Sequence, residues 1–148
     1  MPNIQVTHDV NLNNARSESS IAINQNNPMQ MVCGSKKFKD IHTYDFTLAT
    51  AYSADGGLSW HDSAALPMPG FTLLTDPALA WDDSGNVFLV GLSGNNPPTF
   101  DTIGIEIYKS TDGGKNWSAP KRIHTSTGDD KQWAAGDANP ASPYHGRV

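Results

Sequence analysis

An eight-residue pattern that occurs twice is the feature of this chain that most constrains its fold. The first octet spans 53–60 and the second octet spans 110–117, and both carry Ser, Asp, Gly and Trp at the same four positions. Asp-Gly and Gly-Gly steps favour the positive φ angles of tight hairpin turns, and a short Asp side chain can accept hydrogen bonds from backbone N–H groups nearby. Each octet therefore predicts a braced hairpin turn, after which Trp begins an outgoing strand and packs against a neighbour. The shared residues are Ser53, Asp55, Gly57, Trp60, Ser110, Asp112, Gly114 and Trp117.

Short apolar segments recur in the same order around each octet. They alternate with turn residues, as strands of a small sheet do. The predicted strands are 20–24, 29–34, 46–52 and one from Trp60 onward in the first unit, then 77–81, 86–91, 103–108 and 118–123 in the second. A third cycle begins with 133–137 and 143–148, and one further short strand is expected at 4–7.

Two details of this repeat are also predictions. Gly91 follows Gly34 by 57 positions, so the two glycines are expected to be equivalent. The charged run 36–40 is expected to be a solvated connection between strands.

A period of 55 to 58 residues with four strands per unit is typical of a β-propeller. No segment shows a sustained 3.6-residue apolar period, so we expect an all-β chain with almost no helix. The chain divides into a lead-in (1–16), blade one (17–70), blade two (71–128) and the start of blade three (129–148). Because a closed propeller needs about four to eight blades, these two and a half blades form an incomplete ring. The chain is then part of a longer protein, or several copies complete a ring together.

The two octets resemble the Asp-box, S/T-x-D-x-G-x-T-W, of the sialidase (neuraminidase) and BNR-repeat superfamily. The four shared positions match the motif, whereas its Thr is replaced by Ser59 in the first octet and Asn116 in the second. The segment 130–148 also resembles a segment that recurs in sialidase-like proteins. The resemblance implies a propeller in which the octets lie on outer hairpins and have a structural role.

The resemblance also implies a catalytic apparatus, of which this chain holds few candidates. Sialidases use a Tyr nucleophile assisted by a Glu, an Asp acid/base and arginines that hold the substrate carboxylate. By position, Asp45 and Asp101 correspond to the acid/base, and Arg16 lies two residues before the first arginine position. The comparable segments 18–20 and 75–77 contain no Arg. We favour turn carboxylates and a surface Arg for the three candidates, and we expect a lone chain to be inactive.

Composition excludes several other functions. The net charge is −5 and no basic stripe occurs, which excludes nucleic acid as a partner. No apolar run approaches the ~18 residues of a membrane span, so we expect no segment that crosses a membrane. The five His residues show no metal-ligand spacing, and we expect neither a metal nor a cofactor. Cys33 is alone and is expected to pack as a small buried residue. The resemblance implies secretion, although residues 1–5 lack the features of a signal peptide.

Three functions remain open. The first is part of a sialidase-like glycoside hydrolase that acts on terminal sialic acid or a related glycan. The second is a non-catalytic propeller module that binds a glycan or a protein, and the third is a partial propeller that assembles as a homo-oligomer. Three aromatic residues could stack on a sugar, but their repeat positions favour packing between blades: Trp81, Trp133 and Tyr144.

Overall fold

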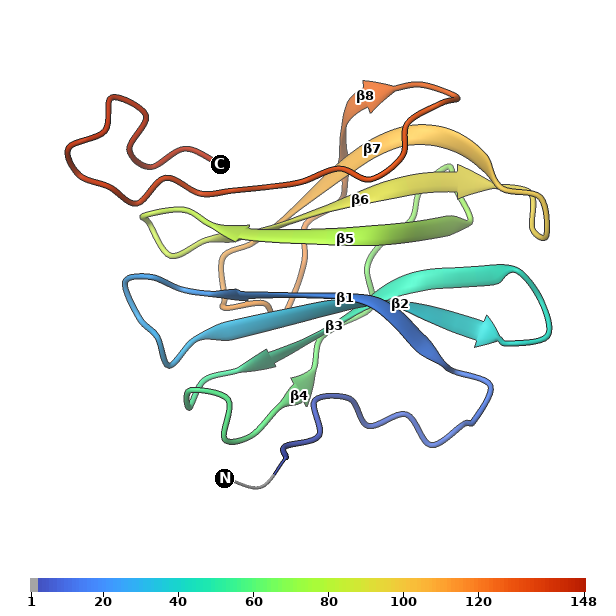
Figure 1. The fold of residues 1–148 in the computed structure, drawn as a ribbon, viewed down its shortest axis with the longest axis horizontal. Coiled ribbons are helices and arrows are strands. Elements are labelled where there is room, and N and C mark those ends of the chain that lie inside the picture. The colour runs from blue at the N-terminus through green and yellow to red at the C-terminus, as the bar shows by residue number, and fades with distance from the viewer. Residues whose placement is uncertain (1–2) are drawn as a thin grey trace.

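The computed structural model describes residues 3–148 and consists of two four-stranded antiparallel sheets, stacked face to face (Figure 1). Each sheet is a meander of consecutive strands, in the orders β1-β2-β3-β4 and β5-β6-β7-β8. No helix occurs among the described residues, which confirms the all-β prediction. The strands are β1 (Arg16–Ile23), β2 (Met31–Asp40), β3 (Asp45–Ser53), β4 (His61–Asp62), β5 (Leu73–Trp81), β6 (Val87–Asn95), β7 (Asp101–Ser110) and β8 (Lys121–Thr125).

The two sheets share one apolar core. Successive side chains of a strand point to opposite faces of its sheet, so every second residue of a strand faces the other sheet. Val32 and Leu48 of the first sheet are buried in this core together with Leu79 and Leu89 of the second. The inner strands β1 and β5 therefore lie next to one another, and β4 and β8 lie at the outer edges of the sheets (Figure 1).

Strand pairing corrects the expected equivalence of the two glycines. Gly34 pairs with Ser20 and Thr50 in the first sheet. The equivalent strand positions in the second sheet are Ala78 and Ile107, and both pair with Val90. Gly91 is therefore one residue out of place. The reason is the connection between the first two strands of each unit, which is two residues shorter in the second unit, at 82–86, than in the first, at 24–30.

Three further predictions of local structure were wrong. Residues 4–7 form no strand, because no neighbouring strand pairs with them. The charged run 36–40 belongs to β2, and Lys36 is buried, at 6% exposed. Neither 133–137 nor 143–148 forms a strand.

The C-terminal segment (126–148) returns across the second sheet beside β5 and β6 (Figure 1). Ala134 packs on an apolar cluster at the far face of this sheet, which includes Ala78 and Val90. The backbone approaches β5 so closely at Gly136 that a side-chain carbon there would overlap the carbonyl oxygen of Trp81. The segment thus covers the second sheet as a first strand of a third unit would, without strand hydrogen bonds.

The first octet forms a loop from 54 to 60, longer than a two-residue hairpin turn. Ser53 Oγ accepts a hydrogen bond from the Gly57 N–H over 2.9 Å, and Asp55 Oδ1 accepts one from the Ser59 N–H over 2.9 Å. The Ser59 hydroxyl also donates to Asp55 Oδ2, so the residue that replaces the motif's Thr still supports the Asp. Gly56 and Gly57 both have positive φ, which closes the loop at low steric cost.

The second octet repeats this geometry in the loop from 111 to 120. Ser110 Oγ accepts from the Gly114 N–H over 2.9 Å, and Asp112 accepts from both the N–H and the side-chain amide of Asn116, over 3.0 and 2.8 Å. Trp60 directly precedes β4, whereas Trp117 lies four residues before β8. Both octets lie where β3 and β7 end, at the end of the sheets opposite the start of β1.

Candidate functional site

The two inner strands carry the same backbone irregularity. The register of β1 breaks between Ser17 and Ser20, and that of β5 breaks between Thr75 and Ala78. Inside these bulges Glu18 and Asp76 both have a φ of 53°, a left-handed conformation that is uncommon for residues other than glycine.

In the C-terminal segment Lys131 also has a left-handed backbone conformation, with a φ of 61°. Strained backbone of this kind is often found at functional sites. Three of the four left-handed residues other than glycine within 3–148, Glu18, Asp76 and Lys131, follow one another at the spacing of the structural repeat, and the fourth is Asn96.

A cavity of about 370 Å³, the central cavity, lies beside these bulges at the end of the sheets opposite the octets. Its walls combine carboxylates, one lysine and aromatic rings, contributed by both sheets and by the C-terminal segment. The walls include Glu18, Lys36, Tyr44, Phe46, Thr75, Asp76, Phe100, Asp129 and Asp130.

The carboxyl groups of Glu18 and Asp76 lie against one another and share a hydrogen bond. Thr75 Oγ1 donates to Glu18 Oε2 over 2.8 Å and lies 3.4 Å from Asp76 Oδ1. Burial, the hydrogen bond to Glu18 and the negative charge of Glu18 together raise the pKa of Asp76 to about 6, while the Lys131 ammonium, 3.9 Å away, opposes this shift. Asp76 therefore holds the shared proton in weakly acidic solution.

The pKa of Glu18 shifts in the opposite direction. Burial by itself would raise its pKa, but hydrogen bonds from Asp76 and Thr75 and the charge of Lys36 outweigh burial and hold the pKa below its ordinary value. Lys36 Nζ lies 3.5 Å from Glu18 Oε1. Below about pH 6 the pair thus consists of one protonated carboxyl group and one carboxylate, the arrangement of two acids with divided roles.

Lys36 is held among aromatic rings. Its Nζ lies 4.1 Å from the ring centroid of Phe46, 5.2 Å from that of Tyr44 and 5.3 Å from that of Phe38. The negative face of an aromatic ring attracts a cation at such distances. The ammonium is therefore fixed beside Glu18 in the wall of the central cavity.

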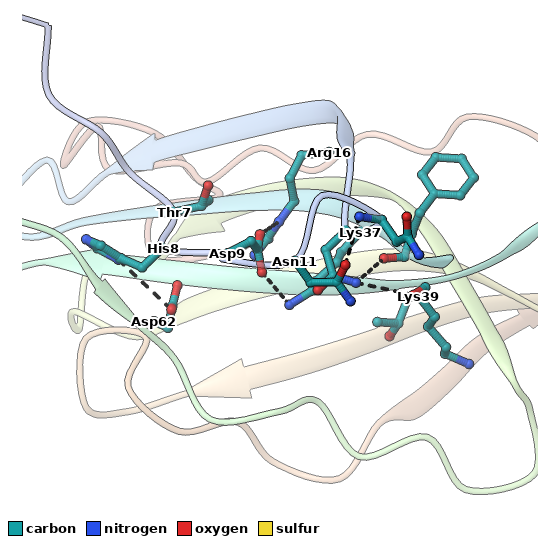
Figure 2. Close-up of polar contacts among 12 residues, drawn as sticks. Thr7, His8, Asp9, Asn11, Arg16, Lys37, Lys39 and Asp62 are labelled. Carbon is teal, nitrogen blue, oxygen red and sulfur yellow. Dashed lines mark hydrogen bonds and ion pairs between the residues drawn. The ribbon is translucent and has the colours of Figure 1, made fainter. Parts of the chain in front are cut away.

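Arg16, one of the sequence-predicted site residues, lies away from this cavity. Its Nε donates to Asp9 Oδ2 over 2.6 Å and its guanidinium also donates to Ser35 Oγ over 3.0 Å. Lys37 Nζ contacts the second oxygen of Asp9, so the two cations lower the pKa of Asp9 against the opposing effect of its burial. Figure 2 shows this cluster where the segment 3–15 crosses the first sheet.

Asp45 and Asp101 lie at the starts of β3 and β7, also outside the central cavity. Asp45 Oδ1 is 2.7 Å from Lys39 Nζ, and Asp101 accepts a hydrogen bond from the Asn96 side chain. The structure therefore does not bring Asp45, Asp101 and Arg16 together. Arg16 and Asp45 line two different hollows, and Asp101 contacts Asn96.

Sequence reasoning missed Glu18 and Asp76 as site residues. The signal in the sequence is that each is an acidic residue near the start of the inner strand of its unit. No sequence rule predicts the bulge that turns both toward one cavity.

Among residues 3–148, no three His, Cys, Asp or Glu side chains are arranged to hold a metal ion. Nor do these residues include a helix with the length and apolarity needed to cross a membrane.

Comparisons with known proteins bear on the fold alone. No protein-family model and no curated protein sequence matches the chain. A protein of unknown function from Dyadobacter fermentans DSM 18053 has a similar structure, with a TM-score of 0.58 and 18% identity over 78% of this chain and 38% of that one. Penicillium chrysogenum alpha-L-arabinanase, complexed with arabinobiose, is similar with a TM-score of 0.50 and 15% identity over 83% of this chain and 36% of the arabinanase. This chain spans less than two fifths of either structure, and its two open sheets are consistent with part of a propeller.

Proposed function

We propose that the central cavity is a binding site for a neutral glycan. The observation that carries this proposal is the pair of Glu18 and Asp76, placed by equivalent bulges of two units in the wall of one aromatic-lined cavity. Carboxyl groups accept and donate hydrogen bonds to sugar hydroxyls, and aromatic rings pack on the C–H faces of a sugar ring. The likeness to an arabinanase that holds arabinobiose supports a glycan-related role.

The charges of the cavity favour a neutral sugar over sialic acid. Glu18, Asp76, Asp129 and Asp130 all line it, and Lys36 is already paired with Glu18. A sugar carboxylate would be repelled by these acids, and its usual partner is a bidentate arginine.

The three arginines of the chain have other surroundings. Arg16 pairs with Asp9, the Arg122 guanidinium lies 2.6 Å from Glu106 Oε1, and Arg147 lies over the ring of Tyr144. Terminal sialic acid, the substrate implied by the resemblance to sialidases, therefore fits this chain less well than a neutral sugar does.

Hydrolysis of the glycan is the second candidate function, and the raised pKa of Asp76, about 6, favours it. A carboxyl group that stays protonated up to about pH 6 can act as a general acid on a glycosidic oxygen in weakly acidic solution. Retaining glycosidases, however, separate their two carboxyl groups by about 5–5.5 Å, and Glu18 and Asp76 hydrogen-bond directly. We therefore propose that this chain binds the sugar and that a further unit supplies the second catalytic group.

We also propose that the chain forms two units and the beginning of a third in a closed propeller of the sialidase type. Ile21 and Ile23 on β1 are 57% and 48% exposed, whereas their counterparts by strand pairing, Leu79 and Trp81 on β5, are buried against the first sheet. Another unit packed on β1 would bury the two isoleucines in the same way. That unit comes from a longer chain or from a second copy, and light-scattering mass of the 148-residue chain distinguishes these sources.

The test of the proposed function is a titration of the chain with neutral and anionic sugars, in which NMR chemical shifts of the chain measure binding. The panel contains methyl arabinofuranoside, methyl xyloside, methyl galactoside and a sialoside. We expect at least one neutral sugar to bind, with an affinity that falls about tenfold or more in Asp76→Asn or Glu18→Gln and is retained in the control Asp101→Asn. Binding of the sialoside alone, or of no sugar, would overturn the proposal.

A further inference from the structure

A second hollow, of about 340 Å³, lies at the tips of two hairpins from different units. One hairpin joins β2 to β3 and the other joins β6 to β7, and both lie at the right-hand end of the molecule in Figure 1. We call this hollow the rim hollow, and its walls are His42, Thr43, Tyr44, Asp45, Pro97 and Pro98.

Tyr44 forms part of the wall of both the central cavity and the rim hollow. Its ring packs edge-on against Phe46, with centroids 4.9 Å apart and planes at 87°. Tyr44 nevertheless remains 44% exposed. The two hollows therefore adjoin at a single aromatic side chain that Phe46 holds in place.

The walls of the rim hollow have the chemistry that sugars require. Tyr44 and the rings of Pro97 and Pro98 provide apolar faces for the C–H side of a pyranose or furanose ring. His42, Thr43 and Asp45 provide donors and acceptors for hydroxyl groups. Asp45 is held in position by Lys39, 2.7 Å away, while its side chain remains 31% exposed.

Resting on the proposed function of the central cavity, we propose that the rim hollow is a second sugar subsite of the same site. A neutral disaccharide or longer glycan would place one sugar beside Glu18 and Asp76 and the next sugar against Tyr44. The two hollows belong to one binding site because they share a wall and because each is formed by both units. The preferred ligand is then an oligosaccharide rather than a single terminal sugar.

The experiment compares a disaccharide with the methyl glycoside of one of its sugars, taken from the panel above, by isothermal titration. We expect the disaccharide to bind the unaltered chain about tenfold more tightly or better. The ratio of the disaccharide affinity to the affinity of the single sugar should fall toward one in Tyr44→Ala. It should also fall in Asp45→Asn, which leaves every aromatic residue in place. The control Tyr144→Ala alters a tyrosine that is 59% exposed and outside both hollows, and it should keep the ratio.

The outcomes separate this inference from the proposed function. If the single sugar binds and the disaccharide binds no more tightly, the rim hollow is not a subsite, although the central cavity still binds a sugar. If the ratio is high and unchanged in both variants, the second sugar lies elsewhere and the inference is wrong. If neither ligand binds, the proposed function fails and the subsite fails with it.

Discussion

The indole Nε1 of Trp117 donates a hydrogen bond to Thr50 Oγ1 over 2.9 Å, which ties the second octet to the β3 strand of the first sheet. Thr50 is buried, at 5% exposed. The octet thus acts beyond its own loop, because it joins one unit to the unit before it.

Trp117→Phe tests this link, because phenylalanine keeps most of the apolar ring and removes the N–H. We expect the free energy of unfolding to fall by about 1 kcal/mol, the usual net value of one hydrogen bond, as measured by urea denaturation. Trp133→Phe is the matched control, since Trp133 is 82% exposed and its change should stay within about 0.5 kcal/mol. Equal effects of the two substitutions would contradict the proposed role of the hydrogen bond.

Two neighbouring glycines of the second octet separate backbone strain from steric overlap. Gly113 and Gly114 have φ values of 78° and 89°, so alanine is strained at both. An added Cβ would lie 3.7 Å from the nearest side-chain atom at Gly113, but it would overlap Val32 at Gly114. We expect Gly113→Ala to cost about 1–2 kcal/mol and Gly114→Ala about 1–3 kcal/mol more, measured by thermal and urea unfolding. Similar losses would show that Val32 moves aside freely.

The pKa of Asp76 makes stability depend on pH. An unfolded Asp loses its proton near pH 4, whereas the folded chain keeps the proton until about pH 6, so the folded state binds more protons between these values. Stability should therefore fall as pH rises from about 4 to about 6, and urea unfolding at several pH values measures this.

Asp76→Asn should remove the fall in stability between about pH 4 and about pH 6, because asparagine has no carboxyl proton to lose. We expect this variant to be about 1 kcal/mol more stable than the unaltered chain at pH 7 and nearly equal to it at pH 3.5. Glu18→Gln keeps Asp76 but removes the neighbouring charge, so the fall should move to lower pH. Parallel curves for all three proteins would contradict the assignment of the shared proton to Asp76.

Lys36→Met tests whether the buried ammonium holds Glu18 in its ionised form. Methionine is similar in length and carries no charge, so the pKa of Glu18 should rise. The measurement is a carbon-13 NMR titration of the Glu18 carboxyl group. Lys36→Arg, which retains a cation among the same aromatic rings, should keep the pKa of Glu18 low. A pKa that is the same in both variants would show that the hydrogen bonds of Glu18 alone lower it.

Ile21 and Leu79 occupy equivalent positions with opposite exposure, and they test whether another unit covers β1. Leu79→Ala should cost about 2–5 kcal/mol, as is usual for a buried leucine. Ile21→Ala should cost less than about 0.5 kcal/mol in the monomer, measured by urea unfolding. If Ile21→Ala lowers the free energy of unfolding strongly at high protein concentration but not at low concentration, copies of the chain associate through β1.

Local turn chemistry made the octets and the order of the eight strands predictable. The glycines and the short polar side chains of each octet determine its loop within a few residues, independently of the rest of the chain. The blade boundaries at 17, 71 and 129 stay predictions.

The candidate site could not be predicted because it depends on contacts between units. Lys36 lies in a charged run that looks solvated, and its burial follows from the aromatic rings of the β2–β3 hairpin and from Glu18. Glu18 and Asp76 are 58 positions apart, and only the stacking of β1 on β5 brings their carboxyl groups together. The prediction of a strand at 4–7 was wrong because an apolar segment without a partner strand has no pairing to stabilise it.

The left-handed residue is a glutamate on β1, an aspartate on β5 and a lysine in the C-terminal segment. Acidic and basic side chains thus both occur at this backbone conformation. Substitution of Glu18 or Asp76 therefore changes the charge beside the central cavity and leaves the β-meanders around it in place.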